Sequence, residues 1–281
     1  MRCAWQAYLN LLPTWMRPEV DKLGSETLQE LRLRTGRPPQ LITAAGSQYL
    51  EREVRNDDLD YCVNAASRYS PWSSATIANG FITAQGGHRM GICGDVAIVN
   101  EKISTVTSIT SLCVRVARDY PGIGFRAANI KGSILIIGSP GRGKTTLLRD
   151  LIRQKNTLYG AIAVVDERRE LFPVVNGSFC FPPGRQTDVI SGCNKNDAIE
   201  MLIRTMNPQW IAVDEVTAEE DCDALIRAGW CGVSLLATAH AETLQDFLNR
   251  PVYKPLIACK LFKNIIVMQP DKSWMLERVS I

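Results

Sequence analysis

The chain has 281 residues, a length that as a prior corresponds to one large domain or two domains of ordinary size, and we favour two. Apolar residues make up 46% and charged residues 22% of the chain, close to the average of soluble globular proteins, which excludes a disordered, fibrous or membrane-embedded protein. The net charge is only +3 and the Lys and Arg residues are dispersed, so the basic stripe that nucleic-acid binding usually needs is absent.

Cysteine usage and the lack of long apolar runs predict a cytoplasmic protein. The nine cysteines are odd in number, form no CxxC pair and have only His88 and His240 as histidine partners for a metal, so reduced, mostly buried thiols are expected. Residues 1–16 make a poor signal peptide, because polar residues interrupt their apolar stretch. No uncharged apolar run approaches the roughly 18 residues that span a bilayer. Any association with the cytoplasmic face of a membrane is therefore expected to be peripheral.

The first residues carry an apolar pattern of their own. Trp5, Leu9, Leu12 and Met16 recur at helical spacing, which predicts a short amphipathic helix that ends near Pro18. Two interpretations of its apolar face stay open. The more common one is packing on its own domain, and the other is docking on a membrane surface or a neighbouring subunit.

The first region of the chain predicts a small α+β domain. Alternating apolar and charged residues over 28–42 predict a half-exposed strand and a turn, and a helix is expected over 57–67. Residues 80–94 are typical of a glycine-rich hairpin that turns near Gly86-Gly87, because glycine tolerates the positive φ of tight turns. A further strand is predicted over 112–117.

A cluster of Pro and Gly over 119–124 is the best linker candidate, so the domains are predicted as 1–120 and 121–281. After the linker, short continuous apolar runs alternate with helical segments, which is typical of strands buried on both faces of a parallel sheet. These runs lie at 133–137, 161–165, 210–213, 233–237 and 265–268. The second domain is therefore predicted to be a doubly wound α/β domain.

A glycine-rich loop follows the first of these runs. Strand, loop and helix stand in the order of a phosphate-binding P-loop. In that motif backbone N–H groups and the helix N-terminus hold phosphates, Lys144 reaches the β and γ phosphates, and Thr145 ligates Mg²⁺. The predicted nucleotide-binding residues are Gly138, Ser139, Pro140, Gly141, Arg142, Gly143, Lys144, Thr145 and Thr146. A nucleoside triphosphate with Mg²⁺ is thus the expected ligand.

Two carboxylates end the apolar strand that begins at Trp210. They lie about 70 residues after the loop, where a P-loop domain places its second motif, an acidic strand end that serves the metal and the water. Asp214 is predicted to hold Mg²⁺, usually through water, and Glu215 to orient the attacking water as the general base.

Two further strand ends are expected near the phosphates, since ligands of such sheets bind at the carboxyl edge. One leads to Glu167, predicted as a second catalytic carboxylate that positions water or metal; the alternative is a solvated helix start. The other leads to His240, predicted to sense the γ phosphate through a hydrogen bond rather than to be only structural. For His88, on the glycine-rich hairpin, a functional and a structural interpretation stay equally open.

A positive charge on the γ phosphate, often from a neighbouring subunit, is a recurrent part of such catalysis. The sequence offers Arg89, Arg168, Arg169, Arg185 and Arg204, and for each of them surface solvation is the alternative. We favour Arg185, because it lies in a loop-like segment shortly before the helix and strand that lead to Asp214-Glu215.

Taken together, these motifs resemble the stage III sporulation protein AA family, sporulation ATPases related to the hexameric motors of type II and type IV secretion. The resemblance covers nearly the whole chain and rests on the segments 30–39, 87–94, 138–145, 165–168, 185–189, 213–216 and 237–241. By this resemblance Glu167 matches the Asp box of the secretion motors, Asp214-Glu215 their Walker B motif and His240 their His box.

The same resemblance implies further properties. The second domain is expected to be RecA-like, the nucleotide to be ATP, and the protein to act as a homohexamer. It is expected in the cytoplasm of the mother cell of an endospore-forming bacterium, where it energises a channel complex toward the forespore and has membrane proteins of that complex as partners. One departure is that the family usually shows a glycine and a basic residue after Val216, where this chain has Thr217-Ala218, which is expected to alter turnover or a subunit contact.

Two rival functions are considered. A nucleic-acid-associated P-loop motor is disfavoured by the dispersed charge. A scaffold that binds nucleotide without hydrolysing it is disfavoured by the intact Glu215, because such a scaffold needs no general base.

Overall fold

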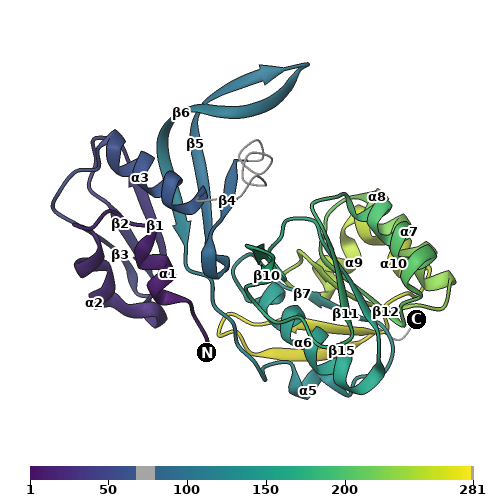
Figure 1. The fold of residues 1–281 in the computed structure, drawn as a ribbon. Coiled ribbons are helices and arrows are strands. Elements are labelled where there is room, and N and C mark those ends of the chain that lie inside the picture. The colour runs from purple at the N-terminus through teal and green to yellow at the C-terminus, as the bar shows by residue number, and fades with distance from the viewer. Residues whose placement is uncertain (68–79, 280–281) are drawn as a thin grey trace. The chain divides into compact units, whose positions relative to one another are not determined.

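The computed structural model describes residues 1–67 and 80–279 of the chain (Figure 1). It divides into two units. The N-terminal unit comprises Met1–Asp119 and Pro173–Phe181, and the C-terminal unit comprises Tyr120–Phe172 and Pro182–Ile281. The chain therefore leaves the C-terminal unit once, for a short excursion, and returns to it. The division into domains 1–120 and 121–281 stays a prediction.

The N-terminal unit is built on one antiparallel sheet with the strand order β3-β2-β1-β6-β5-β4. Its strands are β1 (Leu28–Arg34), β2 (Gln40–Thr43), β3 (Gly46–Tyr49), β4 (Phe81–Thr83), β5 (Arg89–Val99) and β6 (Lys102–Arg115). It also contains α1 (Trp5–Asn10), α2 (Arg17–Thr27), α3 (Asn56–Ser67) and the 3-10 turn η1 (Gln85–Gly87). In β1 the buried Leu31 and Leu33 alternate with the half-buried Arg32 and Arg34, as the sequence pattern predicts. The expected α+β fold is confirmed.

The N-terminal helix is shorter than predicted. α1 ends at Asn10, and Pro18, which was expected to end it, lies in the first turn of α2. Proline is favoured there because its missing N–H has no helical partner. Leu9, Leu12 and Met16 are buried in the core of the N-terminal unit. The apolar face therefore packs on its own unit and is not a free docking surface.

His88 is a structural residue of the N-terminal unit. Its ring is fully buried, and Nδ1 accepts a hydrogen bond of 3.0 Å from the backbone N–H of Ala117. Nε2 lies 3.0 Å from the carbonyl oxygen of Ala4 and donates to it, because the acceptor role of Nδ1 fixes the neutral tautomer. The ring ties the start of the chain to the end of β6. Burial lowers the pKa of His88 to about 4.

This histidine is expected to make the protein less stable in acid. The unfolded chain takes up a proton near the ordinary pKa of about 6.5, whereas the folded chain resists protonation until about pH 4. The contribution of His88 to the free energy of unfolding is thus fully present above about pH 6.5 and falls by up to roughly 3 kcal/mol as the pH drops to 4. Urea unfolding of wild type and His88→Gln between pH 7.5 and 4.5 checks this. Equal pH slopes for the two proteins would contradict it.

β5 and β6 run on beyond the other strands as a two-stranded ribbon (Figure 1). Asn100 and Glu101 turn the chain at its tip, with φ values of 50° and 61°. Of this ribbon the sequence predicted the start of β5, as the second arm of the hairpin that turns near Gly86-Gly87, and the last part of β6. Three register irregularities, the first of them at Cys93/Gly94, interrupt the pairing and with it the alternation on which a strand prediction depends.

The C-terminal unit contains a seven-stranded sheet in the order β11-β8-β12-β13-β7-β14-β15. Its strands are β7 (Ile134–Ile137), β8 (Ile162–Asp166), β11 (Thr187–Ser191), β12 (Trp210–Val216), β13 (Ser234–Ala239), β14 (Asn264–Met268) and β15 (Trp274–Arg278). The pairings are parallel except for the one between β14 and β15. The predicted α/β class with a parallel sheet is confirmed. β11 and β15 were not predicted, because they lie at the two edges and lack continuous apolar runs.

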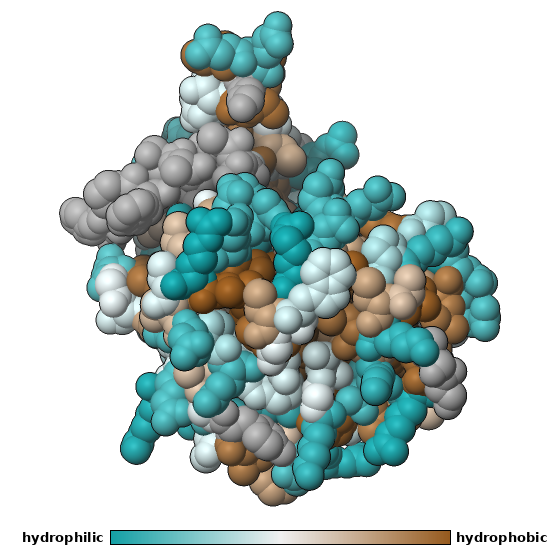
Figure 2. All heavy atoms as spheres, turned by 90° about the vertical axis from the view of Figure 1, so that its right-hand side faces the viewer, coloured by the Kyte–Doolittle hydropathy of each residue, from teal (hydrophilic) through white to brown (hydrophobic). Residues whose placement is uncertain are grey.

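Helices flank this sheet. They are α5 (Phe125–Ala128), α6 (Lys144–Tyr159), α7 (Lys195–Met206), α8 (Glu219–Trp230), α9 (Leu244–Asn249), the 3-10 turn η2 (Pro251–Tyr253) and α10 (Lys254–Ala258). Leu135 and Ile137 of β7 join a core with Leu225 of α8, while Ile134 and Ile136 are equally buried on the opposite face of the strand. Figure 2 looks onto the side of α7 and α8, where polar side chains break up the apolar surface. The strand that leads to the glycine loop is therefore buried on both faces.

The cysteines and the lengths of the helices can be compared with what the sequence led us to expect. All nine cysteines are free thiols, but only Cys62 and Cys222 are buried, so the expectation of mostly buried thiols is wrong. Burial raises the pKa of both of these thiols to about 12. Cys93, Cys231 and Cys259 are exposed. Within residues 1–67 and 80–279, no helix has the length and apolarity to cross a membrane.

Candidate nucleotide site

The predicted site residues gather at one edge of the C-terminal sheet. Val213 of β12 pairs with Val165 of β8, and Ala239 of β13 pairs with Ile137 of β7, so these four parallel strands end side by side. The residues predicted for chemistry lie at these strand ends: Asp214 and Glu215 in the last residues of β12, and Gly138, Glu167 and His240 directly after β7, β8 and β13. The carboxyl edge of the sheet is where such domains bind ligands.

The glycine loop joins β7 to α6. Gly141 and Gly143 have φ values of 76° and 94°, which side-chain-bearing residues rarely adopt. A Cβ atom at Gly138 would lie 2.9 Å from Cβ of Met268, so this position has no room for a side chain. The 16-residue helix α6 begins at Lys144, and the N–H groups of its first turn have no helical partner. Loop and helix start together form the kind of N–H cradle that holds phosphate oxygens.

Lys144 lies folded over this loop. Its Nζ donates to the carbonyl oxygens of Gly138 at 2.8 Å and Ser139 at 3.1 Å, and lies 3.2 Å from Nδ1 of His240. Burial lowers the pKa of Lys144, against the opposing charges of Asp214 and Glu215. The ammonium group is thus held at the loop by partners that phosphate oxygens can replace.

A chain of hydrogen bonds joins α6, β12 and β13. The Thr145 hydroxyl donates to Oδ2 of Asp214 at 2.8 Å, and the Thr238 hydroxyl donates to Oδ1 at 2.5 Å. The same Thr238 oxygen accepts the backbone N–H of Glu215 at 2.7 Å. Hydroxyl and carboxylate oxygens are the ligands that Mg²⁺ prefers. Because the Thr145 hydroxyl points its proton at Asp214, the lone pairs of its oxygen stay available to a metal. The donor set therefore fits the predicted metal.

Glu215 is held from both sides. Its φ of 56° is in the left-handed region, and the pairing of β12 with β13 shifts register between Val213 and Val216, so Glu215 lies in a bulge. Oε1 lies 2.9 Å from Nε2 of His240, and Oε2 forms an ion pair with Arg168. Because His240 Nδ1 faces the Lys144 ammonium, Nε2 carries the proton and donates to Glu215.

Glu167 points to a different partner. Its Oε2 accepts a bond of 2.5 Å from the buried Lys195 at the start of α7, and Lys195 also lies 3.5 Å from Asp221 of α8. The contacts that the structure gives Glu167 do not include Thr145 or Asp214. Its predicted role with water or metal stays a prediction and requires it to leave Lys195.

Comparison with known proteins places this site in a family. A family model described as sporulation stage III, protein AA, matches residues 7–275. The chain belongs to this family. The stage III sporulation protein AA of Bacillus subtilis (strain 168) is 34% identical over 276 residues, or 93% of this chain and 90% of that protein. The protein SEEDLING PLASTID DEVELOPMENT 1 of Arabidopsis thaliana is 28% identical over 89% of this chain, which spans only 36% of that protein.

Solved structures agree with the fold. The Legionella pneumophila ATPase DotB has a TM-score of 0.61 at 17% identity and covers 95% of this chain and 80% of its own. The pilus retraction motor PilT with bound ADP has a TM-score of 0.56 at 15% identity and covers 92% of this chain and 79% of its own. These likenesses confirm the RecA-like fold of the family member.

Arg185 lies away from the other predicted residues. It is exposed in the turn before β11, and β11 starts beside the start of β8, so this turn is at the amino edge of the sheet. Next to it, the N–H of Gln186 donates to Asn156, twelve residues along α6 from Lys144, or about 18 Å at the helical rise. A role of Arg185 within its own subunit's site does not fit. A role in a neighbouring subunit stays a prediction.

Sequence reasoning missed two parts of the site in this family member. Thr238, fully buried between Asp214 and Glu215, carries no signal beyond its place before His240 at a strand end. Arg168 was among five arginines with no reason to prefer it, yet it is the one paired with Glu215. Its place directly after Glu167, at a strand end of the carboxyl edge, was the signal that could have found it.

The departure at Thr217-Ala218 has a local explanation in the structure. The backbone N–H groups of both residues donate to Oδ2 of Asp221, at 2.9 Å and 3.3 Å. Asp221 therefore closes the first turn of α8 without a glycine. An effect of this departure on turnover or on a subunit contact stays a prediction.

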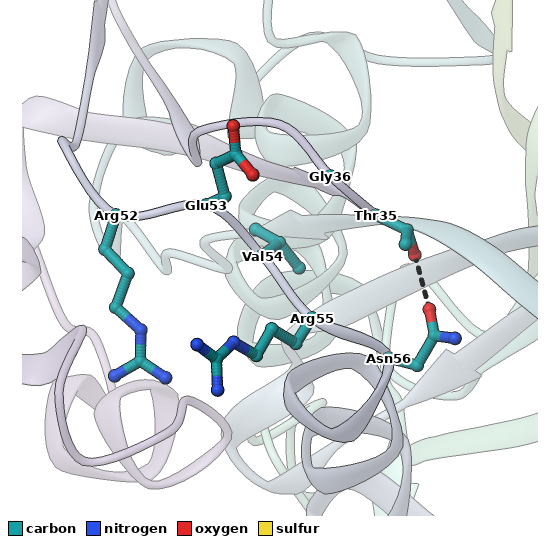
Figure 3. Close-up of a pocket in the computed structure, with 7 residues that line it drawn as sticks. All are labelled: Thr35, Gly36, Arg52, Glu53, Val54, Arg55 and Asn56. Carbon is teal, nitrogen blue, oxygen red and sulfur yellow. Dashed lines mark hydrogen bonds between the residues drawn. The ribbon is translucent and has the colours of Figure 1, made fainter.

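A separate hollow of about 480 Å³ lies in the N-terminal unit (Figure 3). Thr35 and Gly36 line one side of it, and the chain from Arg52 to Asn56 lines the other. The Arg52 guanidinium is 4.4 Å from the centre of the Trp15 ring, and the Thr35 hydroxyl donates to Asn56 at 2.9 Å. No residue predicted for nucleotide chemistry lines it.

Proposed function

We propose that this family member is a Mg²⁺-dependent ATPase that hydrolyses ATP to ADP and phosphate. One observation carries the proposal. The P-loop hydroxyl of Thr145 and the strand-end carboxylate of Asp214 meet at 2.8 Å, with Lys144 and Glu215 directly beside them in sequence. Both partners of a triphosphate-metal site thus stand together at the carboxyl edge of a RecA-like sheet. The similar structures named as an ATPase and as a motor with bound ADP support the choice of nucleotide.

The residues divide the chemistry among them. Lys144 exchanges its loop carbonyls for oxygens of the β and γ phosphates, and the loop N–H groups hold the remaining oxygens. Thr145 and Asp214 would hold Mg²⁺, which would supply positive charge to the phosphates. Water attacks the γ phosphorus, its proton passes to Glu215, and the bond from phosphorus to the β–γ bridging oxygen breaks to release ADP and phosphate. His240 contacts both Lys144 and Glu215, so a movement of Lys144 toward phosphate can shift His240 and, through it, Glu215.

The family gives the cellular setting that we propose. The ATPase works as a homohexameric ring at the cytoplasmic face of a membrane, docked peripherally on membrane proteins of a channel complex. Its hydrolysis energises that complex between mother cell and forespore. In such a ring Arg185 of one subunit is available to a neighbour, because it is exposed. The name of the Bacillus subtilis relative and the description of PilT as a motor support this setting.

Steady-state phosphate release by the purified protein with ATP and Mg²⁺, over a range of protein concentrations, tests the proposal. Turnover per subunit that rises with concentration is the result expected of an assembling ring. Single-stranded DNA and RNA are added in parallel arms. Stimulation by either one would favour the nucleic-acid motor, and no phosphate release at any concentration, with ATP bound, would favour the scaffold.

A further inference from the structure

Arg168 stands out among the cations at the carboxyl edge. Its NH1 forms an ion pair with Oε2 of Glu215, and 54% of its side chain is exposed. Lys144, in contrast, is buried and bound to the loop. Arg168 thus combines contact with the general base and freedom to move.

The backbone under Arg168 is fixed. The carboxylate of Asp166, at the end of β8, accepts the backbone N–H groups of Glu170 at 2.8 Å, Leu171 at 3.1 Å and Phe172 at 2.8 Å. Arg149 of α6 donates to the carbonyl oxygens of Glu170 and Leu171, both at 2.7 Å. The turn is therefore clamped from two sides. An arginine on a rigid turn can swing its side chain without a change in backbone.

The ion pair competes with the work of a general base. Oε1 of Glu215 accepts from His240 and Oε2 is paired with Arg168, so an arriving water finds a donor already on each oxygen. Each oxygen keeps a second lone pair, but release of Arg168 clears Oε2 for the water and removes a positive charge from beside the base. A planar guanidinium binds phosphoryl oxygens in a two-bond fork and is drawn to their higher negative charge.

We propose that Arg168 is a catalytic arginine of its own subunit that passes from Glu215 to the γ phosphate when ATP binds. The inference rests on the proposed function and names a residue and a switch within it. With ADP, which has no γ phosphate, the guanidinium returns to Glu215. One movement thereby places positive charge where negative charge develops in hydrolysis, clears one oxygen of the base, and makes the site distinguish ATP from ADP.

Equilibrium binding separates this role from a structural one. Affinities for ADP and for a non-hydrolysable ATP analogue, both with Mg²⁺, are measured for wild type, Arg168→Gln and Arg168→Lys. We expect Arg168→Gln to weaken analogue binding about tenfold with ADP affinity unchanged, since one charge-assisted bond is lost. Arg168→Lys, which keeps the charge but not the fork, is expected to fall between the two. The matched control is Arg250→Gln, an exposed arginine paired with Asp246, which is expected to change neither affinity.

Turnover gives the second readout. Arg168→Gln is expected to lower kcat at least tenfold at saturating ATP. If Arg168→Gln still prefers the analogue over ADP as strongly as wild type does, the inference is overturned. An increase in kcat would also overturn it, because Arg168 would then only inhibit Glu215 and would not act on the γ phosphate. Failure of wild type to bind either nucleotide would instead overturn the proposed function, so the two failures are distinguishable.

Discussion

Replacing Glu215 with Gln is expected to slow ATP hydrolysis by about 10²–10⁴-fold, the usual contribution of a general base. The amide keeps the size of the side chain and can still accept from His240, which lies 2.9 Å from Oε1. It cannot take a proton from water. Because Gln and Glu have the same backbone preferences, the strain at φ 56° is unchanged and folding is expected to be normal. ATP binding is therefore expected to persist while turnover is lost.

Single-turnover phosphate release and equilibrium ATP binding check this result together. The matched control is Glu242→Gln, which also removes a carboxylate beside the glycine loop, where Oε1 of Glu242 accepts from the Ser139 hydroxyl at 3.4 Å. The control is expected to keep most of its turnover. A Glu215→Gln protein that hydrolyses as fast as wild type would remove Glu215 from the mechanism.

Replacing Lys144 with Ala is expected to weaken ATP binding by one to two orders of magnitude, since hydrogen bonds to charged groups contribute about 1.5–3 kcal/mol. The folded protein is expected to tolerate the change. Burial already lowers the pKa of Lys144, so the free site gains little from the charge itself, and only bonds to Gly138, Ser139 and His240 are lost.

Titration with a fluorescent ATP analogue measures the change, and the unfolding temperature verifies the fold. Lys254→Ala in α10 is the control, because it removes an exposed lysine from the same unit. Unchanged affinity in Lys144→Ala would mean that the ammonium group stays on the loop carbonyls when nucleotide binds, and the proposed exchange would be wrong.

The fold was predictable where a strand is buried on both faces, because such a strand is a continuous apolar run in the sequence. β7, β8, β12, β13 and β14 are central strands, so each is a continuous apolar run between turn signals. Edge strands and the β5–β6 ribbon lack this signal, since one face or edge of each meets water. The end of the first helix was misplaced because Pro18 serves as well at a helix start as at a stop.

The site was predictable as far as strand ends could be ordered. Asp214, Glu215 and His240 follow strands that the sequence marks clearly, and a parallel sheet brings such ends together. Arg185 was preferred over Arg168 because its segment looks like a loop shortly before the helix and strand that lead to Asp214-Glu215, and the strand β11 directly after it was not recognised. Without β11, the sequence could not say which edge of the sheet that turn occupies. Ion pairs such as that between Arg168 and Glu215 depend on side-chain geometry that no motif spacing records.

The excursion over 173–181 limits how the two units can be separated, both in truncated fragments and by recombination during evolution. Its hairpin, β9 (Val174–Val175) and β10 (Ser178–Phe179), ends at Phe181, whose buried ring packs so closely on Gly87 that a Cβ there would lie 3.0 Å from it. A fragment cut at the linker would keep the hairpin and lose its packing partner. For the C-terminal unit to be joined by recombination to a different N-terminal unit, that unit would therefore have to supply a packing site for Phe181.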